Sequence, residues 1–223
     1  MADHSIFEVL GPVMIGPSSS HTAGAARLGR AARQICGKKF NAVHFLLHGS
    51  FAKTYRGHGT DKALAAGVLG MMPYDENLKD ALAIAQRHGV ELSFEPTDLG
   101  DCHENTARII FSLADGGTFY VQGSSVGGGS ILITDIDGFE TEITGEYPTI
   151  VIGHTDKPGV ISEVSTALAA AGINIGVMRV KRRERGMQAS MTIETDEKIP
   201  AAVTEELMKL ENVNTVRVLN PID

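Results

Sequence analysis

Three serines, a histidine and a threonine stand in a row near the start of the chain, as Ser18, Ser19, Ser20, His21 and Thr22. They follow Gly-Pro and precede an alanine-rich stretch with apolar residues near helical spacing, which predicts a helix beginning at residues 20–22. The free N–H groups and the positive dipole end of such a helix favour an anion such as a carboxylate or a phosphate. The alternative is a redundant helix cap beside a surface histidine, and the number of hydroxyls favours the anion site.

Another candidate histidine, His58, stands between Gly57 and Gly59, in a stretch that we expect to be a loop. Flanking glycines would leave its ring uncovered and let a ligand approach closely. Thr60 and Asp61 follow at the expected start of a helix, and a nearby carboxylate or helix end can tune the proton affinity of an imidazole. His58 is therefore a candidate for acid–base work, against the alternative of a solvated loop histidine.

Two later stretches also carry groups that could bind a ligand. Residues 103–106, HENT, include Asn105 and come just before an expected strand, in which Arg108 either clamps a carboxylate or lies on the wet face of a sheet. Gly127, Gly128 and Gly129 join two expected strands, either as a bulged hairpin or as a backbone surface for a ligand. No Lys-Ser or Lys-Thr follows these glycines, so they are not a Walker loop.

Composition excludes several classes of partner. The 223 residues include 20 Lys and Arg against 27 Asp and Glu, a formal net charge of -7, so we expect no nucleic-acid partner. No apolar run approaches the roughly 20 residues that span a bilayer, and the first residues do not resemble a signal peptide, so we expect a cytoplasmic protein with no membrane partner. The two cysteines, Cys36 and Cys102, are expected to be free thiols.

The sequence pattern changes at about residues 144–148, which predicts one domain over residues 1–144 and another over 148–223. The second reads as strand, helix, two strands, helix and strand, a ferredoxin-like βαββαβ order that resembles the ACT domain. ACT domains often bind a small molecule, and the positions that match this use are Asp156, Pro158, Gly159 and Asn174. The alternatives are a tight turn at Pro158 and Gly159 and a left-handed turn at Asn174, in a domain that only pairs.

Five motifs in order, together with this ACT-like end, resemble the β chain of bacterial iron–sulfur-dependent L-serine dehydratase. They are GPSSSHT at 16–22, GS at 49–50, GHGTD at 57–61, HENT at 103–106 and SVGGGS at 125–130. The family pattern commonly has Pro where this chain has Ala25 and an aromatic residue where it has Ser130. These departures bear on the subfamily, because neither touches a polar group.

The resemblance implies an α+β protein, with a mixed sheet before the ACT domain, that turns L-serine into pyruvate and ammonia. It implies a four-iron four-sulfur (4Fe-4S) cluster on a partner α chain, because such a cluster needs at least three thiolates here and this chain has two cysteines. It also implies no metal ligand in this chain, self-association through the ACT domain, and His58 as the catalytic base. The implied substrate-binding residues are Ser18, Ser19, Ser20, His21, Thr22, Ser50, Thr60, Asp61, Asn105, Gly127, Gly128 and Gly129.

Two other functions fit parts of the same pattern. Related small domains serve as regulatory modules in a family of phosphoglycerate dehydrogenases, so a free-standing regulatory protein that binds serine is the first alternative. A serine hydrolase using Ser20 and His58 is the weaker one, since no G-x-S-x-G elbow is present.

Overall fold

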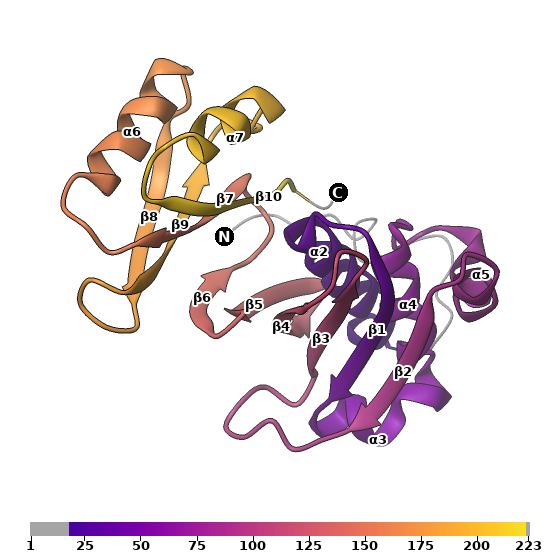
Figure 1. Ribbon diagram of the computed structural model, residues 1–223. Helices are drawn as coiled ribbons and strands as arrows, with labels where there is room; N and C mark the ends of the chain where they lie inside the picture. Colours follow the sequence, from indigo (N-terminus) through magenta and orange to yellow (C-terminus); the bar gives the residue numbers. More distant parts are fainter. Residues whose placement is uncertain (1–17, 222–223) are drawn as a thin grey trace. The chain divides into compact units, whose positions relative to one another are not determined.

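The computed structural model describes residues 18–221, which form two compact units divided between Asp137 and Gly138. Gly16 and Pro17 of the first motif lie outside the described residues. The elements up to this division are η1 (Ser20–Gly24), α2 (Ala25–Cys36), β1 (Phe40–Leu47), α3 (Gly49–His58), α4 (Thr60–Leu69), η2 (Glu76–Asp80), α5 (Ala81–Arg87), β2 (Glu91–Pro96), β3 (Thr106–Leu113), β4 (Thr118–Gly127) and β5 (Ser130–Ile136). Figure 1 shows them in indigo through magenta to pink.

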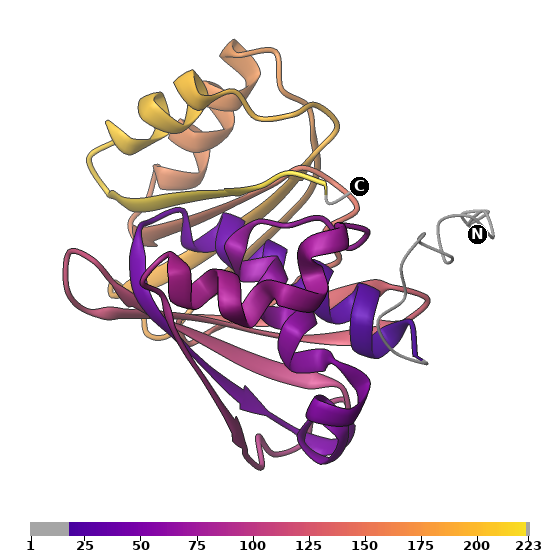
Figure 2. The same cartoon turned by 90° about the vertical axis from the view of Figure 1, so that its right-hand side faces the viewer.

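The first sheet is mixed, as expected, with strand order β2-β1-β3-β4-β5-β6, where β6 is Phe139–Ile143. Strands β1 and β2 are parallel, whereas β1 with β3, β3 with β4 and β4 with β5 are antiparallel. Val43, Phe45 and Leu47 alternate with less buried residues along β1, as expected for a strand with one face against the core. Figure 2 shows the helices of this unit gathered on one side of its strands.

Two helices of this layer touch through glycine. A Cβ on Gly67 of α4 would lie 2.3 Å from the carbonyl oxygen of Ala26 and 2.8 Å from the Cα of Gly29, both in α2. A Cβ on Gly29 would lie 2.5 Å from the carbonyl oxygen of Leu64. Real Cβ atoms do not tolerate such distances, so the two helices approach closely only because both positions lack a side chain.

Side chains of α2 also bond to the end of α4. Arg30 Nη1 donates to the carbonyl oxygen of Gly70 at 2.5 Å, and Arg33 Nη1 donates to that of Val68 at 2.8 Å. Carbonyls in the last turn of a helix have no partner within the helix, and cations there also oppose the negative end of its dipole. Gly29 lies against Gly67, and four residues further along α2 Arg33 lies against Gly70, where a Cβ would be 3.3 Å from Arg33 Nε, so α2 and α4 run in the same direction.

The segment around His58 is helical, so the expected loop is wrong. Helix α3 runs from Gly49 through His58, and only Gly59, with φ of 73°, turns the chain into α4. Phe51 is fully buried and anchors the helix, which tolerates Gly57 in its last turn. The two glycines that suggested a loop are thus one exposed helix residue and one left-handed helix cap.

The start of the first helix differs in form from the expected one. It begins at Ser20, within the expected range, but its first turn, η1, is a π-helical turn, and the side chain of the N-cap residue Ser19 makes no capping hydrogen bond. The amides of His21 and Thr22 already donate to the carbonyl oxygen of Ser18, so these two N–H groups are not available to an anion.

The second unit is the expected βαββαβ domain. After β6 it contains β7 (Thr149–Thr155), α6 (Val160–Ala170), β8 (Ile175–Arg182), β9 (Gln188–Thr195), α7 (Ala201–Met208) and β10 (Val213–Leu219), with sheet order β10-β7-β9-β8. Figure 1 shows α6 and α7 together on one face of this sheet. Its core includes Ile150, Val164, Leu168, Ile193 and Leu207. No helix among residues 18–221 is both long enough and apolar enough to cross a membrane.

The glycine contact predicts opposite effects for two substitutions to alanine. Gly67→Ala is expected to lower the free energy of unfolding by about 1–3 kcal/mol, because its methyl group overlaps the backbone of α2. Gly57→Ala meets no heavy atom within 4 Å and is expected to raise stability by about 0.5–1 kcal/mol, the usual gain inside a helix. Urea unfolding of the full chain followed by circular dichroism measures both. A Gly67→Ala variant as stable as the parent chain would contradict the close contact.

Candidate functional site

The ends of three neighbouring strands bring separate motifs to one edge of the sheet. In the antiparallel ladder of β3 and β4, Thr106 lies opposite Ser124, and the Ser125 amide donates to the carbonyl oxygen of Asn105 at 3.0 Å. The Asn105 amide group also reaches the carbonyl oxygen of Ser125, at 3.4 Å. The start of β3 and the end of β4 therefore place HENT beside SVGGGS.

The third strand end, that of β1, continues directly into helix α3. The amides of Ser50 and Phe51 donate to the carbonyl oxygen of Glu104, which fixes the start of α3 against the HENT segment. Gly49 has φ of 56°, and a Cβ there would lie 2.6 Å from the same carbonyl oxygen. The glycine of the GS motif thus allows the contact that places Ser50 at the site.

His21 is the centre of a group of side chains formed with Ser18, Ser50 and His58, which we call the His21 cluster. His21 is 6% exposed; its Nδ1 lies 3.1 Å from Ser18 Oγ, and its Nε2 lies 3.2 Å from Ser50 Oγ. Burial, and then the nearby imidazole of His58, lower the pKa of His21, so the ring is neutral at pH 7. A neutral imidazole has one donor and one acceptor nitrogen, which suits a bridge between two hydroxyls.

His58 lies against this bridge from the end of α3. Its ring centroid is 4.9 Å from that of His21, with the planes at 80°, and Phe51 packs on His21 at 5.1 Å. The expectation that glycines leave this imidazole exposed is met only in part, because His58 is half-buried. Its Nδ1 is buried and has no hydrogen-bond partner among the described residues. His58 is thus held by a helix and a ring contact.

Several other polar atoms here are also buried without a partner in the described part of the chain. They are Thr60 Oγ1, Asn105 Oδ1 and Ser125 Oγ. A buried polar group without a partner costs about 1–3 kcal/mol, so the presence of these three atoms at the starts of β3 and α4 and near the end of β4 indicates a place for a ligand or a partner chain. Ser125 was not among the candidate residues, although it opens the SVGGGS motif.

Glycines connect the first helix to this edge. A Cβ on Gly24 would lie 2.0 Å from Ser125 Oγ, so the turn at η1 sits directly on that serine. The turn between β4 and β5 uses positive φ angles at Gly127, Gly128 and Gly129, and Arg27 Nη1 donates to the carbonyl oxygen of Gly129 at 3.3 Å. The glycine turn is therefore a hairpin that also contacts α2.

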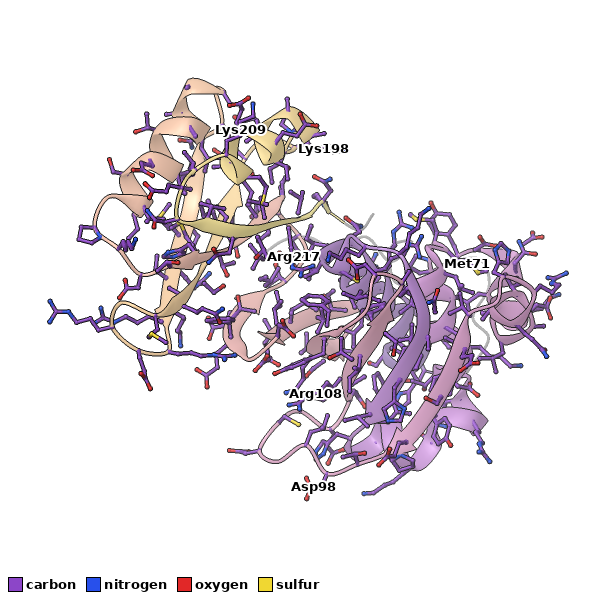
Figure 3. The ribbon with its side chains drawn as sticks, in the orientation of Figure 1. Met71, Asp98, Arg108, Lys198, Lys209 and Arg217 are labelled. Atoms are coloured by element: carbon purple, nitrogen blue, oxygen red, sulfur yellow. The ribbon has the colours of Figure 1, made fainter. Side chains whose placement is uncertain are left out.

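Other candidates are placed differently. Thr22 Oγ1 is committed to the carbonyl oxygen of Ser18 at 2.9 Å. Asp61 lines a cavity to which neither His21 nor Ser50 contributes. Arg108, labelled in Figure 3, donates from Nε to Gln122 Oε1 at 2.9 Å and lies over the Tyr120 ring. These contacts with the neighbouring strand favour the second alternative, a position on the face of the sheet.

The ACT-domain candidates already have partners within their own unit. Asp156 Oδ2 accepts from the Gly186 amide at 3.1 Å and from Arg182 at 3.2 Å; the Gly186 bond chiefly lowers the pKa of Asp156. Asn174 bonds to Asp196 and Glu197 and has no positive φ, so the left-handed turn considered for it is wrong. Pro158 is exposed, and Gly159, with φ of 98°, is the N-cap of α6.

The thiol set of this chain does not suit an iron–sulfur cluster. Cys36 is 1% exposed in the core at the end of α2, and Cys102 lies in the segment before β3. Within residues 18–221 no three His, Cys, Asp or Glu side chains are grouped so that they could hold a metal ion. A four-iron cluster is commonly held by cysteine thiolates, and two cysteines do not supply enough of them.

Comparison with known proteins identifies the domains of this chain and then its family. A model described as "Serine dehydratase beta chain" matches residues 5–90, and the ACT domain matches residues 148–212. "Probable L-serine dehydratase, beta chain" of Bacillus subtilis (strain 168) is 45% identical over 96% of each chain, and "L-serine dehydratase, beta chain" of Peptoniphilus asaccharolyticus is 41% identical over 97% of this chain and 98% of that one. "D-3-phosphoglycerate dehydrogenase" of Methanocaldococcus jannaschii is 28% identical over 88% of this chain and 37% of that protein. The chain belongs to the family of L-serine dehydratase beta chains, which confirms the resemblance seen in its motifs.

The buried His21 predicts a pH-dependent part of the stability. Because burial lowers its pKa in the folded state, the unfolded chain takes up this proton first as the pH falls below 6.5. Folding stability should therefore fall as the pH drops through 6.5 towards the lower folded-state pKa. His21→Gln removes this term, so the variant should lose less unfolding free energy than the parent chain between pH 7.5 and 5.5 by urea titration. Equal losses in the two proteins would contradict a buried neutral His21.

Proposed function

We propose that this chain is the β subunit of an L-serine dehydratase, which converts L-serine to pyruvate and ammonia together with an α subunit. The family of the chain supports this proposal, and the observation that carries it is the His21 cluster, including the unpartnered Nδ1 of His58. We expect the enzyme to act in the cytoplasm, because two free thiols suit a reducing compartment.

The reaction removes a weakly acidic α-proton and expels hydroxide, a poor leaving group. A 4Fe-4S cluster would act as the Lewis acid that takes up this hydroxyl, and we assign the cluster to the α chain because the cysteines of this chain cannot hold it. The role left to this chain is to bind the substrate and to move a proton.

We assign roles within this chain to the residues around His21. Hydroxyls of Ser18, Ser19 and Ser20 at the start of the first helix would receive the substrate carboxylate. Neutral His21 orients Ser18 and Ser50 by its two ring nitrogens. His58 would take the α-proton on its imidazole, and the neutrality of His21 lowers the cost of a positive charge next to it. Asn105 and the turn at residues 127–129 would shape the edge of the site.

The ACT domain supports a proposal of self-association. Strand β8 is at the edge of its sheet, and most of its residues are exposed, including Val180 at 41%. An open strand edge with an apolar side chain favours pairing with another strand. We propose that two copies of this domain pair, whether or not it also binds a ligand at Asp156 or Asn174.

A regulatory protein that binds serine remains the second candidate. It is favoured by the match to phosphoglycerate dehydrogenases, which extends over 88% of this chain for one of them. A regulatory site has no use for a base beside the ligand, so the effect of removing His58 on turnover separates the two functions.

His58 and Ser20 should fail in different ways if they have these roles. Replacing His58 with alanine in the αβ enzyme is expected to lower kcat by roughly 100-fold or more with little change in KM, because proton transfer contributes only in the transition state. Ser20→Ala should mainly raise KM, by the factor for about 1–3 kcal/mol of a lost hydrogen bond to a charged group. Pyruvate formation against L-serine concentration measures both.

The control for this pair is His88→Ala, which changes an exposed histidine at the end of α5. Iron and sulfide content is compared among all variants, so that loss of the cluster is not mistaken for loss of the base. A His58→Ala enzyme with parental kcat and an intact cluster would exclude His58 as the base.

The chain by itself should carry no cluster. Purified anaerobically without the α chain, it is expected to be colourless and to contain no stoichiometric iron or sulfide, because it lacks the thiolates for a four-iron cluster. Assays of iron and acid-labile sulfide, with the visible absorption spectrum of the preparation, test this. About four irons per chain in this preparation would contradict the assignment of the cluster to the partner.

A further inference from the structure

A cavity of about 840 Å³ lies in the first unit, apart from the His21 cluster. Its lining comes from α3, α4, α5 and the edge strand β2, and includes the apolar residues Leu82 and Leu92 and the rings of Tyr55 and Phe94. This volume is within the range of roughly 300–1,000 Å³ that is usual for pockets that bind small molecules.

The aromatic part of this lining is held in place from behind. Phe94 stacks on the fully buried Phe45 of β1, with centroids 4.7 Å apart and planes at 6°, and Tyr55 stacks on Phe94 at 6.1 Å. The stack joins α3 to the sheet, so this side of the cavity is a fixed apolar surface rather than a gap between mobile side chains.

Opposite charges border the same cavity. Arg56 is exposed, with its guanidinium carbon 5.4 Å from the centre of the Tyr55 ring. Asp61 lies in the first turn of α4, where burial raises the pKa of its carboxyl, although the Lys62 amide donates to it at 2.8 Å. Among the described residues neither Arg56 nor Asp61 forms a salt bridge within 4 Å. The charges of Lys62 and Arg56 act on Asp61 from outside salt-bridge distance, so this partly buried carboxylate has no direct cationic partner within residues 18–221 and favours a cationic ligand group.

We propose that this cavity binds a free α-amino acid with a large apolar side chain. Its ammonium group would pair with Asp61, its carboxylate with Arg56, and its side chain would rest on Tyr55, Leu82 and Phe94. A phosphorylated ligand fits less well, because one arginine is the only cation of the lining and two acidic residues, Asp61 and Glu91, oppose it.

The two charged residues lie on either side of the corner that carries His58. Arg56 precedes His58 by two residues at the end of α3, and Asp61 follows it by three in the first turn of α4. A ligand that joins Arg56 to Asp61 therefore spans the turn at Gly59 and holds the segment from which His58 reaches His21. The cavity is thus an effector site, which acts on the position of His58 without touching the other members of the His21 cluster.

Isothermal titration calorimetry of the full chain, without the α chain and without turnover, tests the site. L-leucine is the probe, and L-leucinamide, N-acetyl-L-leucine and L-alanine lack in turn the carboxylate, the ammonium group and the large side chain. L-leucine is expected to bind with a Kd below about 1 mM, and each analogue at least tenfold more weakly, the scale of one lost charged contact or a few buried methylenes.

Variants tie the binding to the two charges. Arg56→Gln and Asp61→Asn should each weaken L-leucine binding at least tenfold. The matched controls, Arg87→Gln and Asp80→Asn, change exposed residues near α5 that do not line the cavity and should bind like the parent chain. Hydrogen exchange of residues 56–61 should slow with L-leucine in the parent chain and not in Arg56→Gln. This substitution leaves the fold intact because the Arg56 side chain is exposed.

Three results would overturn this inference. They are an absence of L-leucine binding at millimolar concentration, equal binding of L-leucine and L-alanine, and binding that persists in both Arg56→Gln and Asp61→Asn. An unchanged exchange rate at residues 56–61 with ligand bound would refute the effector role. None of these measurements depends on serine turnover, so they test this binding site independently of the proposed function.

Discussion

The close approach of α2 and α4 through Gly29 and Gly67 is the contact on which the arrangement of the first unit depends. The helices run in the same direction, so their leading ends lie at one end of the pair. The turn before α2 carries His21, and the corner before α4 carries His58, which explains how two rings 37 positions apart come within 4.9 Å. A side chain at either glycine would push the helices apart and with them the two imidazoles.

Some of the buried polar atoms around His21 and His58 have hydrogen-bond partners, and others have none among the described residues. His21 has a partner for each nitrogen, which offsets the cost of burying the ring, whereas His58 Nδ1 and Ser125 Oγ have none in the described part of the chain. Folded proteins rarely leave buried polar atoms unpaired, and those that remain tend to concentrate where a ligand or partner binds. The hydrophobic core beneath, with Phe45, Phe51 and Phe111 fully buried, supplies the stability that tolerates this cost.

Local patterns were enough to predict the ACT domain, because its strands and helices each carry a clear period and its turns contain glycine or proline, as at Gly159 and Gly186. The mixed sheet was expected from the family resemblance. Helix α3 was missed because glycines on both sides of His58 resemble a loop, and the packing of Phe51 that favours a helix is not a local signal. The ring contact of His21 with His58 and the contact of Ser125 with Gly24 are equally non-local. The sequence therefore indicated candidate motifs, but it did not predict the contacts between their side chains.

In the proposed enzyme this chain contributes His21 and His58 to an active site whose iron–sulfur cluster is held by the α chain. In an anaerobic titration, increasing amounts of this chain are added to an L-serine dehydratase α chain, and the pyruvate formed from L-serine is followed. We expect no turnover by either chain alone and a rise in activity that saturates at a fixed ratio of the two. Full activity of the α chain alone, or no activity of the mixture when the α chain carries its complete cluster, would contradict it.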